Sequence, residues 1–177
     1  MTFSACWIAA SLFHGALAAP PVRAVEVGVA EGSSCARMVD GTVSCWGTLG
    51  GGAVTPEVVA DLQGVVDLDL GRGHACAVRD DGTVWCWGRN PDGQLGDGTK
   101  ADRAVPVQAA GVTDVVRVVA DHMHTCAQRE SGQVSCWGRA GFIGDGKDVD
   151  RLVPTAVRGL SKTVQLIAGD DLTCAIR

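Results

Sequence analysis

Apolar residues alternate with polar ones in four short stretches of the chain, each at the same distance before a cysteine. The apolar positions lie ten, eight and six residues before that cysteine. They are Val25, Val27, Val29; Val66, Leu68, Leu70; Val116, Val118, Ala120; and Val164, Leu166, Ala168. A period of two is that of a β-strand with one buried face. The pattern therefore predicts four strands that present the same apolar face in each of four repeats.

A second cysteine follows ten residues after each of the first three. Midway between them is a triplet that ends in glycine, Asp80-Asp81-Gly82 in the second repeat, which is typical of a three-residue hairpin loop. If Arg79 pairs with Thr83, the two cysteines fall opposite each other in a non-hydrogen-bonded pair, about 4.5 Å apart. The spacing predicts three cross-strand disulfides, Cys35–Cys45, Cys76–Cys86 and Cys126–Cys136. No second cysteine follows Cys174 at this spacing, so the pattern predicts no disulfide partner for it.

The segment Gly-x-Val-x-Cys-Trp-Gly occurs three times, at 41–47, 82–88 and 132–138. The leading cysteines Cys35, Cys76, Cys126 and Cys174 are 41, 50 and 48 residues apart. The length differences fall in loops that follow Trp-Gly, namely Thr48–Thr55, Arg89–Val105 and Arg139–Val153. The expected units are about 25–55, 56–105, 106–153 and 154–177. This organisation indicates a rigid frame with one variable loop per repeat.

Composition and charge exclude several classes of protein. The 177 residues are 46% hydrophobic and 20% charged, which is typical of a globular chain. The net charge is −5 and no basic face is evident, so a nucleic-acid partner is not expected. No apolar run reaches the roughly 20 residues that span a membrane.

Residues 1–18 contain no Lys, Arg, Asp or Glu and end in Ala16-Leu17-Ala18. A short apolar region before a small-x-small site is typical of a secretory signal peptide, although a basic residue at the start is missing. A buried N-terminal helix and a misassigned start are the alternatives. Removal of 1–18 would place residues 19–177 outside the cytoplasm, as a secreted, periplasmic or cell-surface protein in which disulfides persist.

Three segments of the second repeat carry a family resemblance: GHACA at 73–77, DGTVWCWGRN at 81–90 and GQLGDGT at 93–99. They resemble one repeat of the regulator of chromosome condensation family, and the resemblance extends over about 25–177. The third repeat has Ala140 in place of Asn90, and the first lacks the Gln-Leu-Gly segment. The paired cysteines resemble those of exported bacterial members.

The resemblance implies an all-β fold, a seven-bladed β-propeller with about 50 residues per four-stranded blade. This chain would supply about three and a half blades, so we expect an incomplete propeller with further sequence missing. An open arc leaves edge strands that are available for self-association.

The candidate contact residues are one tryptophan and the polar residues of the two longer loops. Trp85 stands where the other repeats have serine, so we expect it to be exposed. The full set is Trp85, Asp92, Gln94, Asp97, Lys100, Arg103, Asp145 and Lys147. His122 and His124 do not favour a metal site, because His124 occupies the repeat position of His74 and is expected to form a hydrogen bond within its own blade.

These residues favour an exported, non-catalytic scaffold that binds a protein or a cell-surface partner through its variable loops. No cofactor or metal is expected, since no such motif occurs. One alternative is a propeller enzyme, a lyase or hydrolase, with its site in missing blades. Another is guanine-nucleotide exchange, the activity of the family's namesake, although fold alone does not carry function across.

Overall fold

A computed structural model describes residues 23–169 and 172–177, and the expected signal peptide lies outside this range. The described residues form three four-stranded antiparallel sheets and one two-stranded sheet. Sheet I contains β1 (Ala24–Ala30), β2 (Ser33–Met38), β3 (Val43–Gly47) and β4 (Ala53–Val58), with a 3₁₀ turn, η1 (Thr48–Gly50). Sheet II contains β5 (Val65–Leu70), β6 (His74–Arg79), β7 (Val84–Gly88) and β8 (Arg103–Gln108). Sheet III contains β9 (Val115–Ala120), β10 (His124–Arg129), β11 (Val134–Gly138) and β12 (Arg151–Ala156), and sheet IV contains β13 (Gln165–Gly169) and β14 (Leu172–Ile176).

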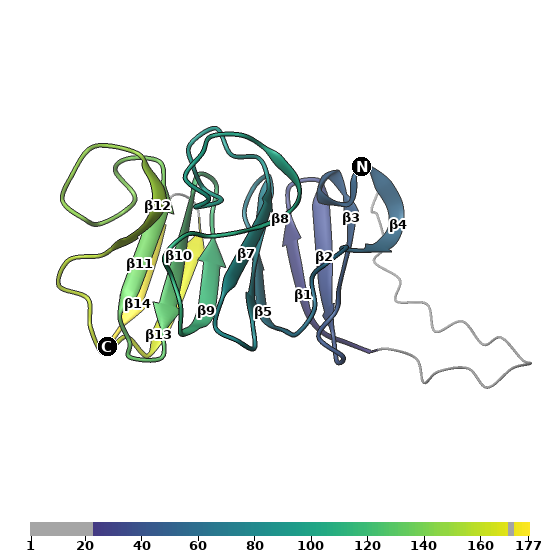
Figure 1. Ribbon diagram of the computed structural model, residues 1–177, viewed down its shortest axis with the longest axis horizontal. Helices are drawn as coiled ribbons and strands as arrows, with labels where there is room; N and C mark the ends of the chain where they lie inside the picture. The colour runs from purple at the N-terminus through teal and green to yellow at the C-terminus, as the bar shows by residue number, and fades with distance from the viewer. Residues whose placement is uncertain (1–22, 170–171) are drawn as a thin grey trace, which may run out of the picture.

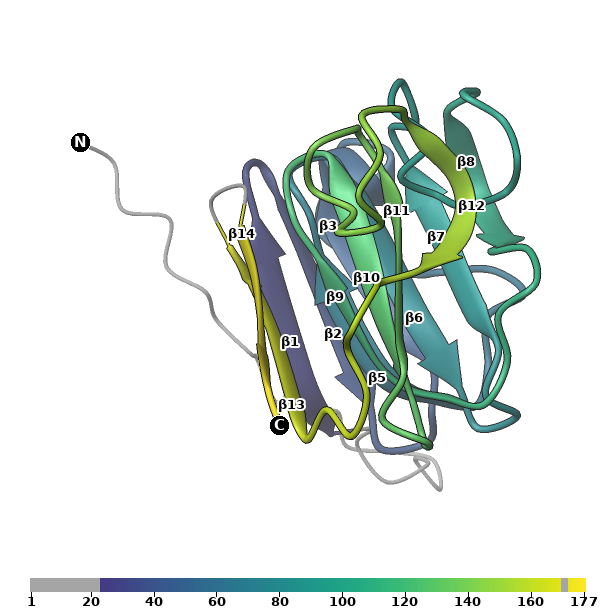
Figure 2. The ribbon, with the colours of Figure 1, turned by 90° about the vertical axis from the view of Figure 1, so that its left-hand side faces the viewer.

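The sheets stack face to face in chain order (Figure 1). Their first strands, β1, β5, β9 and β13, contact one another along one side of the stack, and the last strands β4, β8 and β12 form the sheet edges remote from them. Figure 2 shows this separation of inner and outer strands. Radially arranged four-stranded sheets of this kind are the blades of a β-propeller. The predicted all-β, incomplete propeller is confirmed.

The second and third strands of each complete sheet form the predicted hairpin. In sheet II, the backbone N–H of Arg79 donates to the carbonyl oxygen of Thr83 at 2.9 Å across the turn, and Cys76 pairs with Cys86. All three disulfides are present, with Cα atoms 4.1 Å apart in each. The third loop residue, Gly82, has a φ of 75°, a left-handed conformation that favours glycine. We call this the hairpin end of each sheet; the opposite end, where the third strand leads into the variable loop, is the loop end.

The second glycine of the repeated segment ends the third strand. Gly88 has a φ of 106°, and a Cβ on it would collide with the carbonyl oxygen of Gly73. Gly138 has a φ of 112° and meets the carbonyl oxygen of Met123 in the same way. Glycine is therefore required at this position by the close approach of the loop to the turn between the first and second strands.

One part of the predicted apolar pattern is wrong. The first position of each set, Val66 in the second repeat, was expected on the buried face but is 47% exposed. The pairing with β6 shifts register between Val65 and Asp67, which is a β-bulge, so Val65 is buried instead. Sheets I and III have the same irregularity, and Val25 and Val116 are exposed for the same reason. A bulge breaks the strict alternation on which the prediction rested.

Tryptophan fills the interface between consecutive sheets. Trp87 of sheet II packs in a cluster with Cys35 and Val43 of sheet I and with Leu62 of the segment between β4 and β5, and is 2% exposed. Trp137 of sheet III packs in the corresponding cluster with Leu95, and is fully buried. These two side chains form part of the core between consecutive blades. Val27 and Val29 are 47% and 72% exposed, because no described sheet precedes β1. Trp46, at the same repeat position as Trp87, is only half-buried.

Two aspartates join the inner strands of sheets II and III. Asp67 accepts a hydrogen bond from the backbone N–H of Val118 at 2.7 Å, and Asp69 accepts one from that of Ala120 at 2.8 Å. These N–H groups lie on the inner edge of β9. The carboxylates therefore satisfy edge donors that no neighbouring strand pairs with.

The disulfide pattern makes a thiol count informative. Among the described cysteines, only Cys174 is free, and it is exposed. We expect the native chain cleaved after Ala18 to react with one equivalent of a thiol reagent before reduction and seven after it, as measured by intact mass. Six or seven reactive groups before reduction would contradict the pairing of all three hairpins.

Candidate functional site

The two longer loops meet at the loop end of sheets II and III. They run over residues 89–102 and 139–150, between the third and fourth strands of their sheets. Their bases are buried: Leu95 is fully inaccessible and Ile143 is 1% exposed, and each belongs to an inter-sheet core. The loops are thus anchored by apolar side chains that fill the stack itself.

Asn90 organises the first of these loops. It is fully buried, and its amide nitrogen donates to the carbonyl oxygens of Thr99 and Ala101 at 3.0 and 3.1 Å. Its Oδ1 accepts from the backbone N–H of Leu95 at 3.0 Å. One side chain therefore closes the loop on itself. The third repeat has Ala140 at this position, and there Asp150 Oδ1 accepts from the N–H of Ala140.

A carboxylate–guanidinium pair closes each loop. Asp97 accepts from Arg103 Nε and Nη2 at 2.9 and 2.7 Å, and Asp145 accepts from the same two groups of Arg151. Burial acts to raise the pKa of Asp97, but hydrogen bonds from Thr99 and Arg103 outweigh it and hold the pKa below its ordinary value. The hydrogen bond from Arg151 likewise lowers the pKa of Asp145. Both pairs are structural.

These contacts place part of the expected contact set inside the loops. Gln94 is 3% exposed, Asp145 is 5% exposed, and the side chain of Asp97 is 7% exposed. Asp97 and Asp145 hold the loops in shape and offer little surface to a partner, whereas Gln94 is reached only from a pocket that it lines. Arg103 is 37% exposed and is occupied by Asp97.

The exposed residues of the two loops form a continuous rim. Lys100 Nζ donates to Asp150 Oδ2 at 2.6 Å, which joins the first loop to the second. Lys147 is exposed on the second loop, and Asp92 is half-buried on the first. Trp85 lies apart from this rim, near the start of β7. It is half-buried, and its indole N–H donates to Thr83 Oγ1 while the Arg79 guanidinium lies 5.7 Å from its ring centre.

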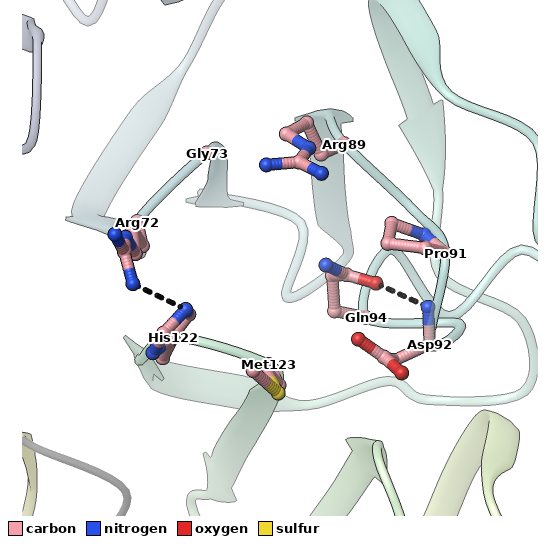
Figure 3. A pocket seen from close by; sticks show the side chains of 8 residues that line it. All are labelled: Arg72, Gly73, Arg89, Pro91, Asp92, Gln94, His122 and Met123. Atoms are coloured by element: carbon pink, nitrogen blue, oxygen red, sulfur yellow. Dashed lines mark hydrogen bonds between the residues drawn. The ribbon is translucent and has the colours of Figure 1, made fainter.

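A small pocket of about 70 Å³ opens between the loop ends of sheets II and III (Figure 3). Its walls come from the turns before β6 and β10 and from the start of the first loop. The lining residues are Arg72, Gly73, Arg89, Pro91, Asp92, Gln94, His122 and Met123. Sequence reasoning missed Arg72 and Arg89. The sequence did contain a signal for them. The first unit has Glu31 and Thr48 at the corresponding repeat positions, so the residue type at these two positions varies between repeats.

The turns after the inner strands carry a row of polar and charged side chains. Arg72 forms an ion pair with Glu31, and its Nη1 lies 3.0 Å from His122 Nε2. These three residues come from sheets I, II and III at one repeat position, four residues before the leading cysteine. They also line a wider depression of about 530 Å³ over the ends of β1, β5, β9 and β13. Arg72 and His122 line both the pocket and the depression.

The repeat histidines serve between the sheets. His74 Nε2 lies 2.8 Å from Thr125 Oγ1 of sheet III, and His124 Nε2 lies 2.6 Å from Thr173 Oγ1 of sheet IV. The expected hydrogen bond within the blade is wrong, because each ring crosses to the next sheet. Burial lowers the pKa of His74 to about 3, with a further lowering from His124. His74 is therefore neutral and structural at neutral pH.

Two further observations bear on the chemistry of the described residues. Within residues 23–169 and 172–177, no three His, Cys, Asp or Glu side chains are grouped so as to hold a metal ion. The same part of the chain forms no helix of the length and apolarity that a membrane crossing requires.

Fold and repeat together define a class: the chain is an incomplete β-propeller of disulfide-braced blades. Two family models, both described as regulator of chromosome condensation (RCC1) repeat, match residues 81–128 and 65–94. Residues 65–128 therefore match the RCC1 repeat. No curated protein matches it in sequence.

Solved propellers of this type superpose on most of the chain. Yeast RCC1 (Prp20) bound to Kap60 has a TM-score of 0.74 at 19% identity, over 90% of this chain and 42% of that one. Human WBSCR16 has a TM-score of 0.74 at 22% identity, over 88% and 45%. A second structure of Prp20p from Saccharomyces cerevisiae has a TM-score of 0.74 at 20% identity, over 90% and 44%. At these identities the likeness concerns the fold, and this chain spans less than half the length of those proteins.

Proposed function

We propose that this chain is an exported propeller protein that binds another protein through the loop end of sheets II and III. The observation that carries the proposal is the construction of that end. Two long loops are held rigid from beneath by Asn90, Asp97 and Asp145, are joined by Lys100 and Asp150, and leave their outer rim exposed. Surface loops on a rigid scaffold lose little conformational entropy on binding.

Three hairpin disulfides support an extracellular or periplasmic location. Disulfides persist in oxidising compartments and are rare in the cytosol. The apolar, uncharged segment 1–18 then acts as a signal peptide, and N-terminal sequencing of the exported chain should begin at Ala19.

Binding of proteins is recorded for similar propellers. Yeast RCC1 is described in complex with Kap60, and Prp20p is described by its binding to Gsp1p and histones. Those partners belong to those proteins; what we carry over is the use of a propeller as a protein-binding platform.

We propose a non-catalytic role for the described sheets. The residues that suggest chemistry are engaged in structure: His74 with Thr125, Cys76 in a disulfide, and Asp97 and Asp145 with arginines. A catalytic site needs a base, acid or nucleophile free to reach a substrate.

The test compares the two ends of the stack. The partner would be captured from the host cell surface, identified and purified, and its affinity measured by calorimetry. We expect the double variant Lys100→Glu, Lys147→Glu to bind at least about tenfold more weakly, because charge reversal at an interface rim disturbs complementarity. The control Arg23→Glu, Arg129→Glu makes the same change of charge at the hairpin end and should bind like the wild type. Equal affinity of wild type and loop variant, or a loss confined to the control, would overturn the proposal.

A further inference from the structure

The pocket between sheets II and III is lined by hydrogen-bond donors that suit the binding of a carboxylate. We propose that it binds the side-chain carboxylate of an aspartate or glutamate presented by the protein partner. The inference rests on the proposed function and names the chemistry of its central contact.

Arg89 supplies the free positive charge. It is exposed at the start of the first loop, and its guanidinium points into the pocket (Figure 3). Within the described residues it forms no ion pair with a carboxylate. Its stem crosses Gly73, where a Cβ would come within 2.8 Å of Arg89 Cδ. A guanidinium placed in this way offers a carboxylate two parallel N–H donors.

Gln94 supplies a second donor at the floor. Its Oε1 accepts from the backbone N–H of Asp92 at 3.0 Å, which fixes the amide and turns its nitrogen toward Arg89 (Figure 3). The backbone of Gln94 is itself held, because its carbonyl oxygen accepts from Thr125 Oγ1 at 2.9 Å and from Trp137 Nε1 at 2.8 Å. The floor is therefore preorganised by the inter-sheet core, and a ligand does not have to order it.

Arg72 and His122 form the opposite wall. The ion pair of Arg72 with Glu31 offsets part of its charge, and its Nη1 lies 3.0 Å from His122 Nε2. Because Glu31 pairs with Arg72 and His122 also contacts it, this wall is not the primary contact.

The size of the pocket selects the ligand. About 70 Å³ is little more than the liquid volume of two water molecules, at roughly 30 Å³ each. A carboxylate group fits, whereas sites for free metabolites usually enclose about 300 Å³ or more. The occupant must therefore gain the rest of its affinity elsewhere. The depression of about 530 Å³ shares Arg72 and His122 with the pocket and provides adjoining surface for a polypeptide.

The repeat itself shows that this site is particular to one interface. At the positions of Arg72 and Arg89, the first unit has Glu31 and Thr48. The third unit has His122 and Arg139, and Arg139 Nη1 is turned to Met123 Sδ at 2.6 Å. Among the described sheets, two arginines flank one pocket only between sheets II and III.

Asp92 gives the proposal an internal control. Its carboxylate lies at the pocket rim on the side of Met123 (Figure 3) and repels a bound carboxylate. Asp92→Asn should tighten binding, and Arg89→Gln should weaken it, although both variants alter one charge in the same pocket.

The experiment uses the full disulfide-bonded chain and two capped tripeptides, acetyl-Gly-Glu-Gly-amide and acetyl-Gly-Gln-Gly-amide, followed by ¹H–¹⁵N NMR. We expect the glutamate peptide to shift the side-chain resonances of Arg89 and Gln94, and the glutamine peptide to leave them in place. Arg89→Gln should raise the apparent dissociation constant about tenfold or more, and Asp92→Asn should lower it. Arg129→Gln removes the same charge at the far end of β10 and should have no effect. The remaining resonances of each variant report whether it is folded.

Two results would overturn the carboxylate site: equal shifts with both peptides, or an equal loss of affinity in the Arg89 and Arg129 variants. The proposed function fails separately. If the partner's affinity falls in the loop-rim variant but is unchanged in Arg89→Gln, the surface stands and the pocket does not. If the glutamate peptide binds as expected but the loop-rim variant keeps full affinity for the partner, the carboxylate site stands and the proposed surface does not.

Discussion

Replacing Trp137 with alanine is expected to lower the free energy of unfolding by about 3–5 kcal/mol. The side chain is fully buried between sheets II and III, and its indole N–H donates to the carbonyl oxygen of Gln94 at 2.8 Å. Truncation removes apolar burial and leaves a cavity, and it leaves that carbonyl oxygen with one donor fewer. Urea denaturation followed by far-ultraviolet circular dichroism measures the change.

Trp46→Ala is the matched control. Trp46 occupies the same repeat position but is only half-buried, since no described sheet packs on that face of sheet I. We expect this variant to lose about 1 kcal/mol or less. If Trp46→Ala and Trp137→Ala were equally destabilising, the face of sheet I would be covered in solution, and our account of the open end would be wrong.

Acid should destabilise the chain through His74. Burial lowers its folded-state pKa to about 3 from an ordinary value of 6.5. Between these two pH values His74 is protonated in the unfolded chain and neutral in the folded chain. The stability that His74 contributes is complete above pH 6.5 and is lost as the pH falls toward 3. The slope is about 1.4 kcal/mol per pH unit within that window.

Asp67 acts in the opposite direction over part of the same range. Burial raises its pKa to about 6 from 3.8, against the opposing hydrogen bond from Val118, so the folded chain holds this proton more tightly than the unfolded chain does. Its contribution is complete below pH 3.8 and is lost as the pH rises through about 6. Burial raises the pKa of Asp69 as well. Between pH 4 and 6 the opposing contributions of the histidine and the aspartates therefore nearly cancel in the unfolding free energy of the wild type.

Two substitutions separate these contributions. The difference in unfolding free energy between wild type and His74→Gln should shrink as the pH falls from 6.5. The unfolding free energy of the wild type relative to that of Asp67→Asn should fall as the pH rises from 4 to 6, by up to about 3 kcal/mol in total. A pH-independent difference for His74→Gln would show that the imidazole is not held neutral by burial.

The local design of each hairpin could be predicted from the residues alone. Ten-residue spacing, a loop glycine and the alternation of paired positions fix which side chains face each other, because the register of a tight turn depends on local geometry. For this reason Cys76 was correctly placed opposite Cys86. The inner strand was less predictable, because the bulge at Val66 breaks an alternation that looks regular in sequence.

The contact residues could be predicted only in part. Lys100 and Lys147 lie on the exposed rim as expected, whereas Gln94, Asp97 and Asp145 are inside. A polar side chain in a glycine-rich loop has the same sequence signature whether it faces a partner or satisfies its own loop. Only the positions of Asn90, Arg103 and Arg151 distinguish the two cases.

By itself, the sequence determined the repeat, the hairpin register, the three disulfides and the all-β architecture, since each depends on contacts between residues close along the chain. Only the tertiary structure decided what lies between the sheets. It placed the His74 side chain against Thr125 of the next sheet, and it brought Arg72, Arg89 and Gln94 together around one pocket. The His74–Thr125 contact joins residues 51 positions apart, and no local pattern encodes it because it arises from the stacking of one sheet on the next.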